Sequence, residues 1–239
     1  MAVKQYKLKI KRFDPERNAH SRWEEFSLSM KPSHRLLDAL AKIKDEIDGS
    51  LTYRRSCAHG VCGSCAMKIN GKNGLACQSL FKDMPEFIVI EPLHGFPVVK
   101  DLVVDIKPFL EKNEEILPFL INNTPPPERE RKQTPQEQNK ILQAITCIMC
   151  GSCTSACPSY QRNNSYLGPS ALVKAARFIF DSRDSAEEER LDKVTQSNGL
   201  WMCHSIYNCV EVCPKNVDIP AHIIKLKQLA VKRKILKQK

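Results

Sequence analysis

The sequence predicts an α+β protein with a β-rich N-terminal part and a helical C-terminal part. Apolar and polar residues alternate in segments of the first hundred residues, a proline-rich stretch follows near residue 125, and helical periodicity dominates beyond it. A chain of 239 residues is long enough for one large or two small domains. We expect a first domain over residues 1–105, a connector over 106–135 and a second domain over 136–239.

The N-terminal part is expected to be a small twisted sheet that grips one helix. Apolar periodicity predicts a helix over residues 35–48, with Ser33 as its N-cap. Asn70-Gly71 predicts a two-residue hairpin turn, because both central residues of such a turn need positive φ. The expected strands cover residues 6–11, 23–30, 66–69 and 87–90.

The second half is expected to be helical. Residues 122–129 contain three consecutive prolines and charged side chains, which favour a solvated connector. Helical patterns follow over residues 136–144, 170–180 and 219–232.

The cysteine content points to metal chemistry. Eleven cysteines are an odd number that cannot pair completely. No apolar run approaches the length of a membrane span, and no signal peptide or presequence is recognisable, so we expect a cytosolic prokaryotic protein or a trimmed one. Thiols stay reduced in the cytosol, which favours metal or cluster ligation over disulfides.

The first cysteine group predicts a 2Fe–2S site. Its spacing is C-x4-C-x2-C followed, after eleven residues, by a fourth cysteine, as in plant-type ferredoxins. Gly60 and Gly63 allow the loop backbone to curl close to a cluster. Zinc is the alternative, but it favours paired C-x2-C motifs. The predicted ligands are Cys57, Cys62, Cys65 and Cys77.

The remaining cysteines form two related runs. The second group is a C-x2-C-x2-C-x3-C-P run, in which the fourth cysteine serves the other cluster of two-cluster ferredoxins. It comprises Cys147, Cys150, Cys153 and Cys157, followed by Pro158. The third group has the same offsets without the second ligand and comprises Cys203, Cys209 and Cys213, followed by Pro214.

Exchange of the fourth cysteines between these runs predicts two sites. A 4Fe–4S cluster would take Cys147, Cys150, Cys153 and Cys213. A 3Fe–4S cluster would take Cys157, Cys203 and Cys209, because Ile206 stands where a ligand to a fourth iron would be. The alternative is loss of one cluster, but the predicted sites use all eleven cysteines.

The C-terminal end is strongly basic. From Lys225 to Lys239 there are seven lysines and arginines and no acidic residue, and the formal net charge of the chain is +10. Such an end can be a solvated helical tail, or it can meet an anionic membrane surface, a partner or nucleic acid. No aromatic platform or nucleic-acid motif accompanies it, so nucleic acid is not expected as a partner.

Several segments closely resemble the iron–sulfur subunits of succinate dehydrogenase and fumarate reductase. The segment Arg54-Arg55-Ser56-Cys57-Ala58-His59-Gly60-Val61-Cys62-Gly63-Ser64-Cys65 matches their plant-ferredoxin motif, and residues 70–77 continue it. Further landmarks are residues 101–105, Gly168-Pro169, residues 181–184 and Cys203-His204-Ser205-Ile206. The resemblance covers residues 6–227, nearly the whole chain.

The resemblance implies a β-grasp 2Fe–2S ferredoxin domain and an α-helical ferredoxin domain. It implies a subunit of succinate dehydrogenase, with a quinol:fumarate reductase as the alternative. The partners would be a flavoprotein subunit that holds FAD and oxidises succinate, membrane-anchor subunits and a quinone. The chain would lie on the cytoplasmic face of a prokaryotic inner membrane. It would carry no catalytic residue of its own, because the dicarboxylate site is on the flavoprotein.

The resemblance also implies a quinone site beside the 3Fe–4S cluster. Its residues here would be Pro158, Ser159, His204 and Ile206. His204 would donate a hydrogen bond or a proton to the quinone, and the alternative is a surface histidine beside a cluster. The chain departs from the family after Tyr160, where residues 161–164 replace a tryptophan pair. A tryptophan that contacts quinone in relatives therefore has no counterpart.

Three other functions compete with succinate dehydrogenase. His204 favours a dehydrogenase, whereas residues 196–201 look more like a fumarate reductase. The iron–sulfur subunit of another flavin-linked oxidoreductase would seldom share every landmark. A zinc-stabilised basic nucleic-acid-binding protein would account for the cysteines and the tail. It would not account for the ferredoxin offsets, the prolines after two cysteine runs, or Ile206 at the missing ligand position.

Overall fold

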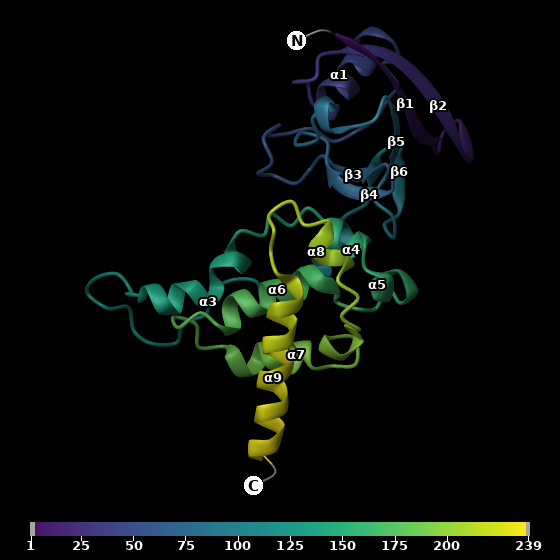
Figure 1. Ribbon diagram of the computed structural model, residues 1–239. Helices are drawn as coiled ribbons and strands as arrows, with labels where there is room; N and C mark the ends of the chain where they lie inside the picture. The colour runs from purple at the N-terminus through teal and green to yellow at the C-terminus, as the bar shows by residue number, and fades with distance from the viewer. Residues whose placement is uncertain (1–2, 238–239) are drawn as a thin grey trace. The chain divides into compact units, whose positions relative to one another are not determined.

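The computed structural model describes residues 3–237 and divides into two compact units. The first unit contains residues 1–106 together with 148–156, and the second contains 107–147 together with 157–239. Figure 1 shows the strands gathered in the first unit and helices in the second. The division places a short piece of the second cysteine run in the unit that contains the sheet.

A five-stranded mixed sheet forms the first unit. Its order is β2-β1-β5-β3-β4, with β1 and β5 parallel and the other neighbours antiparallel. The strands are β1 (Lys4–Asp14), β2 (Asn18–Met30), β3 (Ala66–Ile69), β4 (Lys72–Leu75) and β5 (Phe87–Glu91). A separate two-stranded ribbon joins β6 (Val98–Lys100) and β7 (Val103–Val104). All four expected strands are present.

Helix α1 (Leu36–Glu46) supplies one side of the sheet's hydrophobic core. Leu36, Leu40 and Ile43 are fully buried together with Leu8 and Ile88 of the sheet. The sequence placed the N-cap at Ser33, but the structure places it at Arg35. The Asp38 carboxylate accepts a hydrogen bond from the Arg35 backbone N–H at 2.8 Å, which satisfies one of the free donors at the helix start.

The hairpin of β3 and β4 turns at Asn70-Gly71, as predicted. Both turn residues have positive φ, 47° and 83°. Ala66 pairs with Leu75 at the open end of the hairpin. The two strands therefore end side by side, with Cys65 just before one and Cys77 two residues after the other.

A buried ionic network fastens strand β1 to two loops. Arg12 is 2% exposed, and its Nε donates to Asp101 at 3.0 Å. Asp101 also accepts from the backbone N–H groups of Phe13 and Thr52, at 3.0 and 2.9 Å. A carboxylate with three donors is well satisfied in a buried position.

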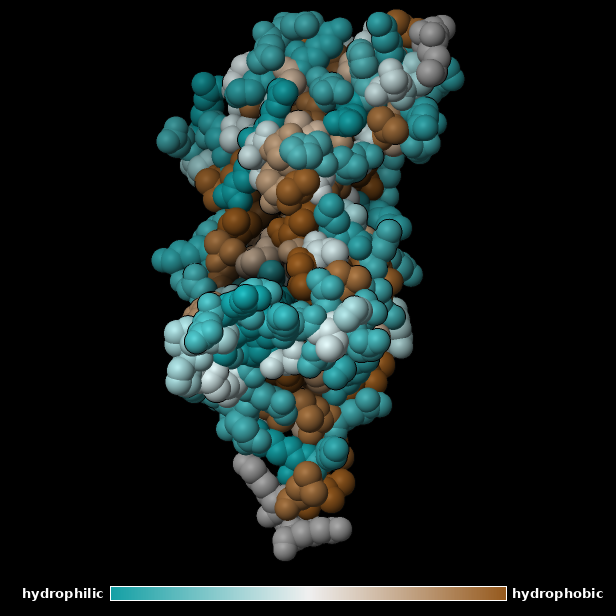
Figure 2. Space-filling model, turned by 90° about the vertical axis from the view of Figure 1, so that its left-hand side faces the viewer, coloured by the Kyte–Doolittle hydropathy of each residue, from teal (hydrophilic) through white to brown (hydrophobic). Residues whose placement is uncertain are grey.

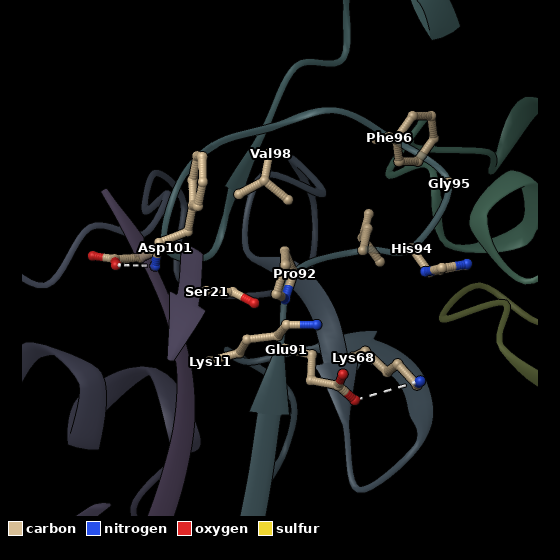
Figure 3. A pocket seen from close by; sticks show the side chains of 12 residues that line it. Lys11, Ser21, Lys68, Glu91, Pro92, His94, Gly95, Phe96, Val98 and Asp101 are labelled. Carbon is tan, nitrogen blue, oxygen red and sulfur yellow. Dashed lines mark hydrogen bonds and ion pairs between the residues drawn. The ribbon is translucent and has the colours of Figure 1, made fainter. Parts of the chain in front are cut away.

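A hollow lies beside this network on the first unit (Figure 3). Its lining includes Lys11, Lys68 and His94, and Lys68 makes an ion pair with Glu91 at 3.4 Å. None of its lining residues is a cysteine, so it is separate from the predicted cluster loop.

Helix α6 (Gly168–Ile179) is the centre of the second unit. It packs against α2 (Lys107–Glu114), α3 (Pro135–Ile145), α7 (Glu187–Val194) and α9 (Ile219–Lys237). Figure 1 shows α6 with α9 running past it. Its buried positions include Ala171, Ala175 and Ala176, small side chains that allow neighbouring helices to approach closely. Helix α2 occupies the start of the expected connector.

Short elements in the second unit contain or border the later cysteines. They are α5 (Pro158–Arg162), the 3₁₀ helix η2 (Leu200–Met202) and α8 (Asn208–Glu211). A fourth short helix, α4 (Ser152–Ser155), belongs to the first unit. Among residues 3–237, no helix combines the length and the apolar character that a bilayer crossing needs.

Candidate iron–sulfur sites

The loop over residues 57–65 gathers backbone N–H groups around one sulfur. The N–H groups of His59, Val61 and Cys62 point at the Cys57 Sγ over 3.5, 3.4 and 3.3 Å. These hydrogen bonds lower the pKa of Cys57 to about 6, because they stabilise the thiolate. A thiolate is the form that ligates iron, so the loop is prepared for a cluster before one binds.

Two glycines give this loop its shape. Gly60 and Gly63 have φ of +79° and +72°, a region that side chains disfavour. A Cβ on Gly63 would lie 2.7 Å from the Cβ of Cys150, and one on Gly60 would lie 2.9 Å from the side chain of Gln78. At Gly63 both the close approach of backbone atoms and the left-handed conformation require glycine, whereas at Gly60 the left-handed conformation is the main reason.

The other two thiols of the group come from the hairpin. The Ala76 N–H donates to the Cys65 carbonyl at 3.1 Å, which extends the β3–β4 ladder and brings Cys65 and Cys77 to the same end. Both cysteines are buried, at 3% and 1% exposure, and burial raises the pKa of Cys65 to about 12. Cys62 is exposed, and the Ser64 hydroxyl at 3.1 Å lowers its pKa. The thiols of this group therefore differ in exposure, with Cys62 exposed and Cys65 and Cys77 buried.

The second unit contains a small cavity around three thiols. Cys157, Cys203 and Cys209 line it, and its volume is about 20 Å³. Cys157 is the N-cap of α5, Cys203 follows η2 and Cys209 lies in α8. Burial raises the pKa of Cys157 and raises that of Cys209 to about 12. These thiols are the three expected at the 3Fe–4S site.

Ile206 lines the same cavity, on a strained turn. Ser205 and Tyr207 on either side of it have φ of 55° and 70°. Non-glycine residues rarely adopt this left-handed conformation, and it clusters at functional sites. The turn gives the cavity an apolar side chain where a fourth thiol would be needed for a fourth iron.

The residues present fit the two clusters. Three backbone donors converge on the Cys57 sulfur. In the cavity, the backbone N–H groups of Ser159 and Tyr160 point toward the Cys157 sulfur, and the Tyr166 hydroxyl is buried without a hydrogen-bond partner. Donors aimed at thiolates are typical of cluster sites.

The four cysteines of the predicted 4Fe–4S site are divided between the two units. Cys147 and Cys213 belong to the second unit, and Cys150 and Cys153 to the first. Two of them have a local partner: the Val217 N–H donates to the Cys213 Sγ at 3.4 Å, and the Cys150 Sγ lies 3.5 Å from the Ser152 hydroxyl. Their joint ligation of a cluster stays a prediction.

Comparison with protein families matches both predicted ferredoxin domains. Residues 7–111 match a 2Fe-2S iron-sulfur cluster binding domain, and residues 143–217 match a 4Fe-4S dicluster domain. The succinate dehydrogenase iron-sulfur subunit of Paracoccus denitrificans is 44% identical over 94% of this chain and 87% of its own length. The chain belongs to the family of succinate dehydrogenase and fumarate reductase iron–sulfur subunits.

Two further comparisons agree with this family. The fumarate reductase iron-sulfur subunit of Haemophilus influenzae is 39% identical over 91% of this chain and 89% of its own length. A chain in the solved structure of the Mycobacterium smegmatis Sdh1 complex in the apo form is 25% identical, with a TM-score of 0.84 over 98% of each chain. The predicted fold class, a sheet-containing 2Fe–2S domain followed by a helical ferredoxin domain, is confirmed.

The structure brings the expected quinone residues of this iron–sulfur subunit to one place. Pro158, Ser159, His204 and Ile206 all line the three-thiol cavity. His204 and Ile206 are exposed, whereas Pro158 and Ser159 are half-buried. Their side chains are therefore within reach of a molecule at the mouth of the cavity, and their role toward a quinone stays a prediction.

Two residues near the cavity were missed by the sequence reasoning. The Lys227 ammonium donates to the Cys203 carbonyl at 2.8 Å, although the sequence counted Lys227 only as part of a basic tail. Tyr166 lines the cavity and is fully buried. Its position two residues before the Gly168-Pro169 landmark was the only local signal, and neither contact follows from periodicity.

Proposed function

We propose that this chain is the electron-transfer subunit of a succinate:quinone oxidoreductase, a succinate dehydrogenase. It takes electrons from the FAD of a flavoprotein subunit, carries them through 2Fe–2S, 4Fe–4S and 3Fe–4S clusters, and delivers them to a membrane quinone. The proposal rests on the three-thiol cavity, in which Ile206 stands at the position of a fourth ligand. A series of clusters that ends in 3Fe–4S needs such a site.

The ligand sets belong to the same proposal. The 2Fe–2S cluster takes Cys57, Cys62, Cys65 and Cys77, and the 3Fe–4S cluster takes Cys157, Cys203 and Cys209. The 4Fe–4S cluster takes Cys147, Cys150, Cys153 and Cys213. The proposed domains are residues 1–105 and 136–239, joined by 106–135. The clusters supply one-electron transfer, and the protein supplies burial, charge and hydrogen bonds to sulfur.

The two relatives favour succinate oxidation over fumarate reduction. The succinate dehydrogenase subunit of Paracoccus denitrificans is 44% identical to the chain, and the fumarate reductase subunit of Haemophilus influenzae is 39% identical. The proposed direction of electron flow is therefore from succinate to quinone.

The exposed edge of the 2Fe–2S loop is the proposed entry point for electrons. Val61 is 54% exposed and Cys62 is also exposed, whereas Cys65 and Cys77 lie on the buried side. A flavoprotein that covers this edge brings its FAD close to the cluster without the need to open the core. At the other end, His204 donates a hydrogen bond to a quinone oxygen at the mouth of the cavity.

Helix α9 offers a surface for the membrane end of the complex. Ile224, Val231, Ile235 and Leu236 are exposed and lie on α9 beside Lys232. Figure 2 shows brown, hydrophobic surface toward the lower end of the view. Apolar side chains flanked by lysines suit anchor subunits at an anionic membrane surface. We place the chain on the cytoplasmic face, held there by the anchors.

Low-temperature EPR of the anaerobically purified complex tests the proposal. A 3Fe–4S cluster is paramagnetic when oxidised, whereas the other two become paramagnetic on reduction. We expect one signal before reduction and two further signals after dithionite, together with succinate-dependent quinone reduction. No signal in either state, with zinc found by metal analysis, would contradict the proposal and favour a zinc-stabilised binding protein.

A further inference from the structure

The Tyr166 hydroxyl is an unusual group in the second unit. Its side chain is 0% exposed, and the hydroxyl has no hydrogen-bond partner among the described residues. A buried hydroxyl without a partner is costly, and buried polar groups of native proteins nearly always have one. We therefore expect the hydroxyl to have a hydrogen-bond acceptor in the protein with its clusters bound.

Backbone hydrogen bonds fix the position of Tyr166. The Tyr166 N–H donates to the Asn163 carbonyl at 3.1 Å, and the next N–H, of Leu167, donates to the Asn198 carbonyl at 2.8 Å. The residue lies two positions before α6, whose first turn is buried. Backbone fixed on both sides and full burial leave the side chain little freedom to turn toward solvent.

The surroundings of the hydroxyl identify the acceptor. Tyr166 lines the cavity with Cys157, Cys203 and Cys209. Of these thiols, Cys203 is the one placed to share a hydrogen bond with the Tyr166 hydroxyl. A tyrosine phenol is protonated in the physiological range, so the hydroxyl is available as a donor.

We propose that Tyr166 is a positioning residue whose hydroxyl donates a hydrogen bond to the Cys203 thiolate and thereby raises the reduction potential of the 3Fe–4S cluster. The inference rests on the proposed function, because it assumes that Cys203 ligates this cluster. Reduction adds negative charge to the cluster and its ligand sulfurs, so a donor stabilises the reduced form more than the oxidised one. Electron transfer to the 3Fe–4S cluster, the last of the three clusters, becomes more favourable.

A redox titration of the purified complex, followed by the oxidised 3Fe–4S EPR signal, tests this. In Tyr166→Phe the equilibrium constant for reduction should fall about three- to tenfold, which for one electron is a decrease of about 30–60 mV in midpoint potential. The matched control is Tyr6→Phe, which removes another buried hydroxyl, the one 3.4 Å from the Phe81 carbonyl in the first unit. Its 3Fe–4S midpoint should equal that of the wild type.

A second variant moves the potential in the opposite direction. Incorporation of 3-fluorotyrosine at position 166 keeps the ring shape and makes the phenol a stronger donor, so the midpoint should rise. This variant also decides the matter if Tyr166→Phe loses its cluster: a higher midpoint supports the proposal, and a wild-type midpoint overturns it.

Different results would overturn the proposed function and the role of Tyr166. Absence of an oxidised-state signal in the wild-type complex would overturn the proposed function itself. A normal wild-type signal with equal midpoints in wild type, Tyr166→Phe and the fluorinated variant would overturn only the role of Tyr166. That result would make it a packing residue.

Discussion

Cys57 in the 2Fe–2S loop and Cys209 in the three-thiol cavity are prepared for iron in opposite ways. In the loop, three backbone N–H groups surround the Cys57 sulfur and lower its pKa to about 6. In the cavity, burial dominates and raises the pKa of Cys209 to about 12. The loop therefore stabilises a thiolate at Cys57 without metal, whereas Cys209 needs the charge of bound iron to lose its proton.

The exposure of a sulfur determines how strongly one hydrogen bond changes the properties of the cluster it binds. An exposed sulfur such as that of Cys62 is partly screened by water, so a single hydrogen bond changes its energy little. A buried sulfur has few competing partners, so each hydrogen-bond donor changes its energy more. We expect changes around the cavity to shift cluster properties more strongly than matching changes around the loop.

Removal of a cavity thiol should have the largest effect. Cys209→Ala leaves two thiols around a desolvated cavity, which is too few to hold the 3Fe–4S cluster. We expect the oxidised-state EPR signal to vanish and succinate:quinone activity to fall about a hundredfold or more. The 2Fe–2S signal after reduction is the internal control. A retained oxidised-state signal would show that Cys209 is not a ligand.

A new thiol at Ile206 should convert the site rather than destroy it. Ile206 lines the cavity between two left-handed residues, so Ile206→Cys places a thiol on the same turn. We expect 4Fe–4S in place of 3Fe–4S, with loss of the oxidised-state EPR signal and one more iron per chain by metal analysis. Ile206→Val is the control. An unchanged 3Fe signal in the cysteine variant would contradict the assignment of ligands.

Addition of a methyl group at Gly63 should test whether the loop needs its close backbone contact and its left-handed conformation. Gly63→Ala adds a Cβ 2.7 Å from Cys150 and strains a φ of +72°, and we expect a loss of about 3 kcal/mol in the free energy of unfolding. Gly71→Ala is the matched control, because φ is +83° and nothing lies within 4 Å. It should cost only about 1 kcal/mol.

Denaturant unfolding of the two glycine variants separates the close contact from the backbone strain. Equal losses in both would show that the approach of the loop to Cys150 is unimportant.

Loss of the Ser64 hydroxyl should have the smallest effect. The hydroxyl lies 3.1 Å from the exposed Cys62 sulfur and lowers its pKa. Ser64→Ala should lower the 2Fe–2S midpoint by about 20 mV, a twofold change in the equilibrium constant for reduction. EPR-monitored titration measures it beside Tyr166→Phe at the buried site. A larger shift for Ser64→Ala than for Tyr166→Phe would invert the proposed contrast.

Much of the site could be predicted because its signals are local in sequence. The offsets of the cysteine runs predicted which thiols belong together, and the structure places Cys157, Cys203 and Cys209 around one cavity. Local signals failed at a helix end, where Asp38 and Arg35 replaced the expected cap at Ser33. Several residues near a helix start can cap it, and the choice depends on the path that the chain takes from the end of β2 to α1.

The sequence alone determined the family, the two kinds of ferredoxin domain and the number of thiols available to clusters, because spacing and turn chemistry are properties of neighbouring residues. Only the tertiary structure decided which groups outside the cysteine runs face the sulfurs. Tyr166 and Lys227 approach Cys203 from elements far from it in sequence. Such contacts arise when α6 and α9 pack together, and no local pattern encodes that packing.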